Sequence, residues 1–137
     1  MSGRALTDRD YKVLAAFRCE LRGFLARSET IARGIGVPPQ QHQALLAVRG
    51  YDGEEPMTVG ALAECLFIKH HTTVELVDRL VDRGLLTREE DPHDRRRITL
   101  RLTPQAHGVL AELTEAHVEE IHRLAPLLKT VLEQVAG

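Results

Sequence analysis

Apolar residues recur at helical spacing through the first quarter of the chain. Between Thr7 and Gly34 they fall three or four positions apart, which predicts one long helix with an apolar face. Thr7, followed three residues later by Asp10, is typical of a helix start in which the two residues cap each other. A second helix is predicted from Pro39, a favoured first helical residue, to about Arg49.

Two further helical patterns follow in close succession. They cover 58–66 and 69–83, with a turn of two or three residues between them, and Gly84 ends the second. Thr58 is the predicted N-cap of the first. Phe67 and Ile68 occupy the turn, where many such motifs have glycine.

The segment after these helices has the period of a β-hairpin. Residues 97–102 alternate strictly, with Ile98, Leu100 and Leu102 on one face, as in a half-buried strand. A strand at 85–89 and a polar tip at 90–96 complete the hairpin. Two helices with a tight turn followed by a hairpin form a winged helix-turn-helix, an arrangement that reads duplex DNA.

The last part of the chain is again helical. Thr103 is a predicted N-cap, and Pro104 takes the first helical position. Pro126 is expected to break or kink this helix and to leave a last short helix after it. The predicted fold class is therefore mainly α (α+β), a winged helix-turn-helix with a small β-hairpin wing between flanking helices.

The long first helix has more apolar surface than a small domain can cover. Phe17, Leu21 and Phe24 lie on one face, so part of it is interpreted as a subunit interface. Judged from this helix alone, the apolar face is explained equally well if it packs only against its own domain. The predicted organisation is one domain at 1–137, with a winged part at about 38–104 and dimerisation helices at about 7–34 and 104–137.

Composition narrows the class of protein. The chain has 137 residues, 43% of them hydrophobic, which indicates a globular domain. A net charge of −2 argues against a nonspecific nucleic-acid coat, although basic residues gather in the hairpin. No apolar run is long enough to cross a bilayer and the start lacks a signal core, so no membrane association and a cytoplasmic location are expected.

Residues with reactive or metal-binding side chains show no catalytic or metal-binding pattern. Glycine-rich phosphate loops and nucleophile motifs are absent from the sequence, so neither enzyme activity nor a cofactor is expected. Cys19 and Cys65 are too far apart for a zinc signature, and Cys65 is interpreted as a core residue. The spacings of His107, His117 and His122 do not present two ligands on one helix face, so no metal site is expected.

Specific stretches of the sequence resemble the MarR family of bacterial transcriptional regulators. The similarity is carried by Leu62–Leu66, Val77–Leu86, Asp91–Arg97 and Leu102–Pro104, and the order of elements is similar over nearly the whole chain. The resemblance implies a homodimer in which the first and last helices interlock and double-stranded DNA is bound at a pseudo-palindromic site. It also implies repression of nearby genes, often relieved by a small aromatic effector bound between the dimer helices and the winged part.

The wing residues have roles implied by this resemblance. Arg96 matches the family arginine that enters the minor groove, where A·T-rich sequence concentrates negative potential. Asp94 matches the aspartate that holds a wing arginine in place. Arg95 and Arg97 are assigned to phosphates from their position on the wing. The alternative is a solvated hairpin tip with a local ion pair.

The first turns of the helix predicted at 69–83 are polar, as expected of a recognition helix. His70, His71 and Thr72 are candidates for base edges, and Glu75 for a cytosine amino group. The remaining candidates, for phosphate, are Lys69 and Thr73. Any one of these residues could instead cap the helix or face solvent.

Two other interpretations of the sequence remain beside a ligand-responsive, DNA-binding regulator. Some relatives sense oxidants through a cysteine in the first helix, where Cys19 lies, and a sensor needs access and a lowered pKa. Burial as a small apolar residue is the alternative for Cys19. A winged helix can also serve only as a protein-interaction module, but such a module does not need three consecutive arginines in its wing.

Overall fold

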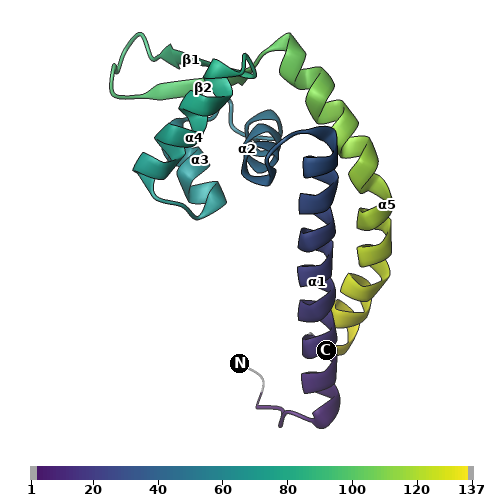
Figure 1. Cartoon of the computed structure of the whole chain (residues 1–137). Helices are drawn as coiled ribbons and strands as arrows, with labels where there is room; N and C mark the ends of the chain where they lie inside the picture. The colour runs from purple at the N-terminus through teal and green to yellow at the C-terminus, as the bar shows by residue number, and fades with distance from the viewer. Residues whose placement is uncertain (1–2, 136–137) are drawn as a thin grey trace. The chain divides into compact units, whose positions relative to one another are not determined.

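The structure is a computed structural model that describes residues 3–135. In these residues five helices accompany one two-stranded antiparallel hairpin (Figure 1), which confirms the mainly helical winged fold. The elements in chain order are α1 (Asp8–Ile35), α2 (Pro39–Arg49), α3 (Val59–Leu66), α4 (His70–Asp82), β1 (Leu86–Glu90), β2 (Ile98–Leu102) and α5 (Pro104–Val135).

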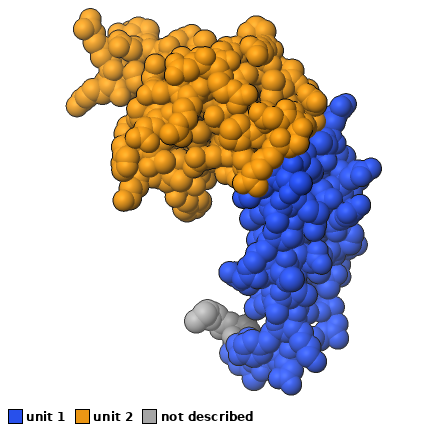
Figure 2. Space-filling view, viewed as in Figure 1, with its two compact units in different colours: residues 1–31, 115–137 blue, residues 32–114 orange. Residues whose placement is uncertain are grey.

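The chain divides into two units, coloured separately in Figure 2. Unit 1 combines Met1–Ile31 with Glu115–Gly137, and unit 2 is Ala32–Thr114. The core of unit 2 is formed where α2, α3, α4 and the hairpin meet. Its fully buried large side chains include Leu45, Leu62, Leu76, Leu80, Leu85, Leu86 and Leu100.

Two predicted helix caps are confirmed at atomic detail. The Thr58 hydroxyl accepts a hydrogen bond from the Ala61 amide at 3.0 Å, which begins α3. At the start of α1, the Thr7 amide donates to an Asp10 carboxylate oxygen at 2.9 Å, and the Asp10 amide donates to the Thr7 hydroxyl at 3.3 Å. This reciprocal pair satisfies backbone donors that a helix start otherwise leaves unpaired.

The turn between α3 and α4 has a strained residue at its centre. Phe67 has φ 55°, in the left-handed region that disfavours bulky side chains. The residue is 95% exposed, so packing within unit 2 does not offset this cost. The sequence therefore adopts the left-handed turn geometry without the glycine that usually supplies it.

The hairpin is tied to the segment before α3. Leu86 pairs with Leu102 and Glu90 with Ile98, and a single bridge joins Thr58 to Thr99. The Leu100 amide also donates to the Met57 carbonyl at 2.9 Å, so the segment before α3 joins the hairpin through one bridge and one further hydrogen bond. This bridge buries Thr99, which the alternation had placed on the polar face.

Two other expectations are wrong. Pro126 lies inside α5, which continues to Val135 as one helix, so no separate last helix forms. Proline removes one backbone hydrogen bond, and the helical turns on both sides keep theirs. Cys65 is exposed and not part of the core, because α3 buries Val59, Leu62 and Ala63 instead.

Within unit 1, α1 and the later part of α5 lie side by side (Figure 1). Arg27 and Glu120 form an ion pair at 2.5 Å, and Ser28 is hydrogen-bonded to the ring of the buried His117 at 2.7 Å. Large apolar side chains of this unit nevertheless remain exposed. They are Leu6, Tyr11, Leu14, Leu25, Val118, Ile121, Leu128 and Leu132.

Candidate nucleic-acid interface

The first turns of α4 present most of the predicted recognition residues to solvent. Lys69 is the N-cap residue, and its extended backbone starts the helix without a side-chain cap. His70, His71 and Glu75 are exposed, and Thr72 is half-buried. Leu76, Val77 and Leu80 anchor the opposite face in the core. A helix fixed in this way can offer its polar first turns to a base edge.

Thr73 is the exception among the predicted α4 residues. It is fully buried, and its hydroxyl donates to the Lys69 carbonyl at 2.9 Å. The expected phosphate contact by Thr73 is therefore wrong, because the hydroxyl has a partner inside the helix and no exposed surface. Val74, the next residue, is apolar and yet 37% exposed.

The wing tip holds its arginine through an aspartate. The Arg96 side chain is 94% exposed, and its Nε lies 3.6 Å from Oδ1 of Asp94. The same carboxylate oxygen accepts a hydrogen bond from the Arg96 amide at 3.1 Å. Asp94 thus contacts both the backbone and the side chain of Arg96, which matches the positioning role that the resemblance implied.

The neighbouring arginines differ from each other. Arg97 contacts Glu55 at 3.3 Å and Asp91 at 4.0 Å, so its charge is partly neutralised at the base of the tip. Arg95 is exposed at the tip itself. Of these two predicted phosphate contacts, Arg95 is the better placed.

A groove of about 450 Å³ connects the wing to the recognition helix. We call it the wing groove. On one side it is lined by His70 and Val74 of α4, and on the other by Asp94, Arg96 and Arg97 of the wing. The start of α3 at 58–60 and Ile98 complete it. The structure therefore brings together side chains that lie more than 20 positions apart in the sequence.

One pair that matters for this geometry was not predicted. Arg88 of β1 forms an ion pair with Asp78 of α4, and this pair ties the wing to the recognition helix. Each residue alone is an ordinary surface charge in the sequence, so only the fold reveals the contact. Val74 was not predicted as part of the site either, because it is apolar. Its spacing of four and three residues from His70 and His71 places it on the same helix face, and it lines the groove.

The remaining candidates lie outside this interface. Cys19 is exposed on α1, so the access that oxidant sensing requires is present, and the sensing role stays a prediction. The part of the chain that the structure describes contains no group of histidine, cysteine and carboxylate side chains able to hold a metal ion. Across residues 3–135 no helix is long and apolar enough to span a membrane.

Comparison with known proteins agrees with this geometry. A model of the MarR family matches residues 35–97. The chain is 29% identical over 99 residues to a Thauera aromatica protein whose name assigns it to transcriptional regulation of the hcr operon. The match covers 72% of the chain and 58% of that relative, so the chain spans less than two thirds of its length.

Solved structures share the fold over almost the whole chain. AbsC from Streptomyces coelicolor, a MarR family transcriptional regulator, is 19% identical with a TM-score of 0.73, over 97% of this chain and 95% of AbsC. MepR from S. aureus, solved in complex with DNA, is 18% identical with a TM-score of 0.69, over 89% of this chain and 85% of MepR.

The fold and the wing groove define a winged helix-turn-helix protein. Residues 35–97 match the model of the MarR family of transcriptional regulators, and structural neighbours such as AbsC are MarR family proteins, so the resemblance seen in the sequence is confirmed.

Proposed function

We propose that the protein is a transcriptional regulator that binds double-stranded DNA in a sequence-specific manner. The observation that carries this proposal is the wing groove, where His70 of the recognition helix and Arg96 of the wing line one surface. A helix start and an exposed arginine placed in this way suit adjacent grooves of a duplex. The relative MepR, solved with DNA, supports the same reading.

Within this proposal, His70, His71 and Thr72 read base edges, and Glu75 accepts from a cytosine amino group. Exposed Lys69 and Arg95 contact phosphates, with Arg97 contributing less because of its acidic neighbours. Arg96 enters the minor groove, held by Asp94. This division assigns sequence preference to α4 and much of the salt-dependent affinity to the wing.

The protein acts as a homodimer in this proposal. The exposed apolar side chains of unit 1, such as Ile121 at 49% and Leu132 at 61%, are what a subunit interface would cover. A two-fold dimer matches a pseudo-palindromic operator with half-sites about one helical turn apart. Repression relieved by a small aromatic effector, in the bacterial cytoplasm where the operator lies, completes the proposal.

Selection from a random duplex library tests this function directly. Purified protein is incubated with the library at roughly physiological salt, and bound sequences are amplified and read. We expect enrichment of a two-fold symmetric motif whose halves lie about ten base pairs apart. Weak, salt-sensitive binding without enrichment would argue against sequence-specific regulation by the free protein and favour a winged helix that contacts another protein.

A further inference from the structure

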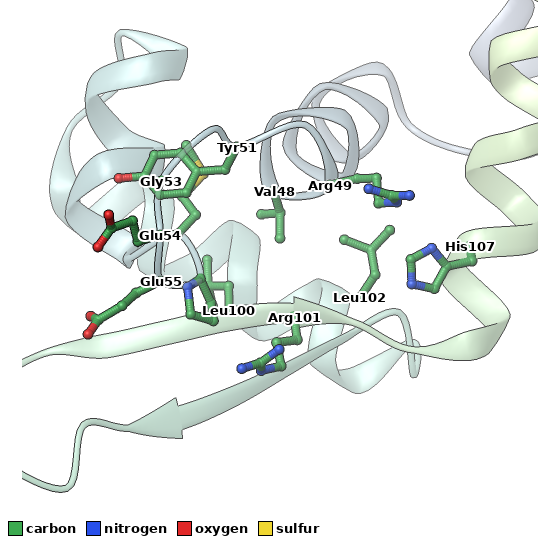
Figure 3. A pocket seen from close by; sticks show the side chains of 12 residues that line it. Val48, Arg49, Tyr51, Gly53, Glu54, Glu55, Leu100, Arg101, Leu102 and His107 are labelled. Atoms are coloured by element: carbon green, nitrogen blue, oxygen red, sulfur yellow. The ribbon is translucent and has the colours of Figure 1, made fainter.

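The wing groove differs from a second hollow of unit 2 in what it can offer to DNA. The second hollow measures about 400 Å³ and lies between the end of α2, the loop at 50–56, β2 and the first turn of α5 (Figure 3). Its loop side carries the carboxylates of Glu54 and Glu55, which do not suit a phosphate backbone, and none of its lining residues belongs to α4. The wing groove includes the recognition helix through His70 and Val74.

An apolar spot interrupts the polar lining of the wing groove. Val74 of α4 is 37% exposed, and the buried Val59 and the half-buried Ile98 line the same groove. The exposed side chains that line it with them are polar or charged, namely His70, Asp94, Arg96 and Arg97. A single exposed valine is ordinary on most of a protein surface. In this groove, however, the valine would lie against the groups that a DNA base presents.

The position of Val74 on α4 places it beside the residues proposed to read bases. Val74 follows His70 by four positions, so both lie on one face of the helix, about 6 Å apart along its axis. Gly60, at the start of α3, also lines the groove. A Cβ added to Gly60 would have only the Thr58 hydroxyl within 4 Å, at 3.9 Å. The chain's own side chains therefore leave this part of the groove open.

The base edges of the major groove differ in what they offer to an exposed valine. Thymine alone among the four bases presents an apolar group there, its C5-methyl group. This methyl group leaves water when it contacts valine, and no polar atom loses a hydrogen bond. The amino group of cytosine, or the acceptors of a purine, would lose water against valine and gain no partner. An apolar residue in this place therefore favours thymine.

We propose that Val74 is a specificity-determining residue that contacts the C5-methyl group of a thymine in the major groove. This inference rests on the proposed DNA-binding function and adds an apolar contact to the polar readout by the histidines. Because Val74 lies one helical turn after His70, the thymine lies within about two base pairs of the base that His70 contacts, at about 3.4 Å per step. The methyl group of 5-methylcytosine occupies the same ring position and meets the same valine.

Replacement of thymine by deoxyuridine in the selected operator tests this contact. The replacement removes one methyl group and keeps the base pair, and it is made at one thymine position at a time in both half-sites. Fluorescence anisotropy measures the affinity of each duplex. We expect one thymine position at which deoxyuridine weakens wild-type binding about fourfold per half-site, the value of one buried methyl group. With Val74→Ala, the thymine and deoxyuridine duplexes should bind almost equally.

Val81→Ala is the matched control. Val81 lies on the same helix seven residues after Val74, but it packs against the core of unit 2 and does not line the wing groove. This variant loses the same side chain and should keep the full response to deoxyuridine, and thermal melts check that both variants are folded. Any effect of the methyl group on DNA shape is the same for all three proteins, so the difference between them reports the contact.

Cytosine methylation supplies an independent measurement at the same position. A C·G pair in place of the T·A pair should weaken wild-type binding, and 5-methylcytosine should recover about fourfold of it. With Val74→Ala, methylation of this cytosine should change the affinity little. A recovery of the same size with both proteins would contradict the contact.

The outcomes separate this inference from the function on which it rests. If operator DNA is bound but no thymine responds, or if deoxyuridine weakens wild type and Val74→Ala equally, the role of Val74 is refuted and DNA binding stands. If the library yields no enriched sequence, the DNA-binding function fails and the inference fails with it. Arg96→Ala should weaken binding to the thymine and deoxyuridine duplexes by the same factor, because its contact does not involve the methyl group.

Discussion

The Arg96 guanidinium is almost wholly exposed, yet Asp94 contacts both its side chain and its backbone amide. Such an arrangement limits the positions that the charge can take while leaving it available to a partner. We predict that Arg96→Ala weakens binding to every DNA sequence and lowers the slope of log affinity against log salt by about one unit.

Arg101→Ala is the matched control for this change. Arg101 lies on the same hairpin and carries the same charge, but it is paired with Glu89 and lies away from the tip. Fluorescence anisotropy at several salt concentrations measures both slopes. If the two variants lost affinity and slope equally, the tip position would have no special role and net charge alone would explain the effect.

Substitution of His71 tests the preference for particular DNA sequences and not the general affinity for DNA. Its side chain is exposed in the first turn of α4, where a base edge is within reach of a docked helix. We predict that His71→Ala relaxes preference at particular base pairs of the selected motif, with about 1–3 kcal/mol lost in discrimination there. Repeating the library selection with the variant measures this loss, and an unchanged motif would remove His71 from the readout.

Phe67 offers a stability test that is independent of DNA. Its φ of 55° costs about 1–2 kcal/mol for a residue with a Cβ, and its exposed ring contributes little packing in return. We predict that Phe67→Gly raises the free energy of unfolding by about 1 kcal/mol relative to Phe67→Ala. Both variants lose the ring, so urea titrations of the pair isolate the backbone effect. Equal stability would mean that the turn relaxes when the ring is removed.

At the scale of the elements, the start of α1 depends on an ionised carboxylate. The hydrogen bond from Arg4 is the largest cause that lowers the pKa of Asp10 below its ordinary value of 3.8, and the Thr7 amide is the next. Because the folded pKa is the lower one, this stabilisation is fully present above the unfolded pKa and is lost as pH falls through the folded pKa.

We therefore predict that Asp10→Asn melts at a lower temperature than the wild type at pH 7, and that the difference shrinks below about pH 4. Asp8→Asn removes the same charge from the same helical turn and serves as the control. Thermal melts across this pH range measure both variants. A difference that stayed constant down to pH 2 would show that the ionised Asp10 is not responsible.

Local chemistry decided which elements could be predicted. Thr58 and the pair of Thr7 and Asp10 identify their helix starts, because a cap depends on residues three positions apart. Pro126 misled the prediction, since a proline costs a helix about one hydrogen bond but does not oblige it to end when neighbouring turns are supported.

The candidate site, like the helix starts, was predictable only where a residue's role depends on its near neighbours in the sequence. Exposure of His70 and Arg96 followed from local polarity, and both indeed line the wing groove. Burial of Thr73 and exposure of Val74 depend instead on how α4 is rotated in the core, which the spacing of apolar residues defines only within about one position. The pair of Arg88 and Asp78 requires the fold itself.

At the scale of the whole molecule, the apolar surface of unit 1 requires an explanation that its own contacts do not provide. Ile121 on α5 is 49% exposed, and Leu46 on α2 of unit 2 is exposed to the same 49%. Ile121 belongs to a group of such residues on the paired helices, which is the pattern that a two-fold interface would cover. The two positions therefore form a matched pair for one substitution.

We predict that Ile121→Asp converts the protein to monomers at micromolar concentration, because a buried carboxylate without a partner opposes association. Leu46→Asp should leave the dimer intact. Sedimentation velocity measures the oligomeric state of both variants, and circular dichroism checks that each is folded. The monomeric variant should also lose most of its affinity for a two-fold operator while keeping weak binding to a half-site. If folded Ile121→Asp sedimented as the wild type does, α5 would not form the interface at this position, and the apolar surface of unit 1 would need another partner.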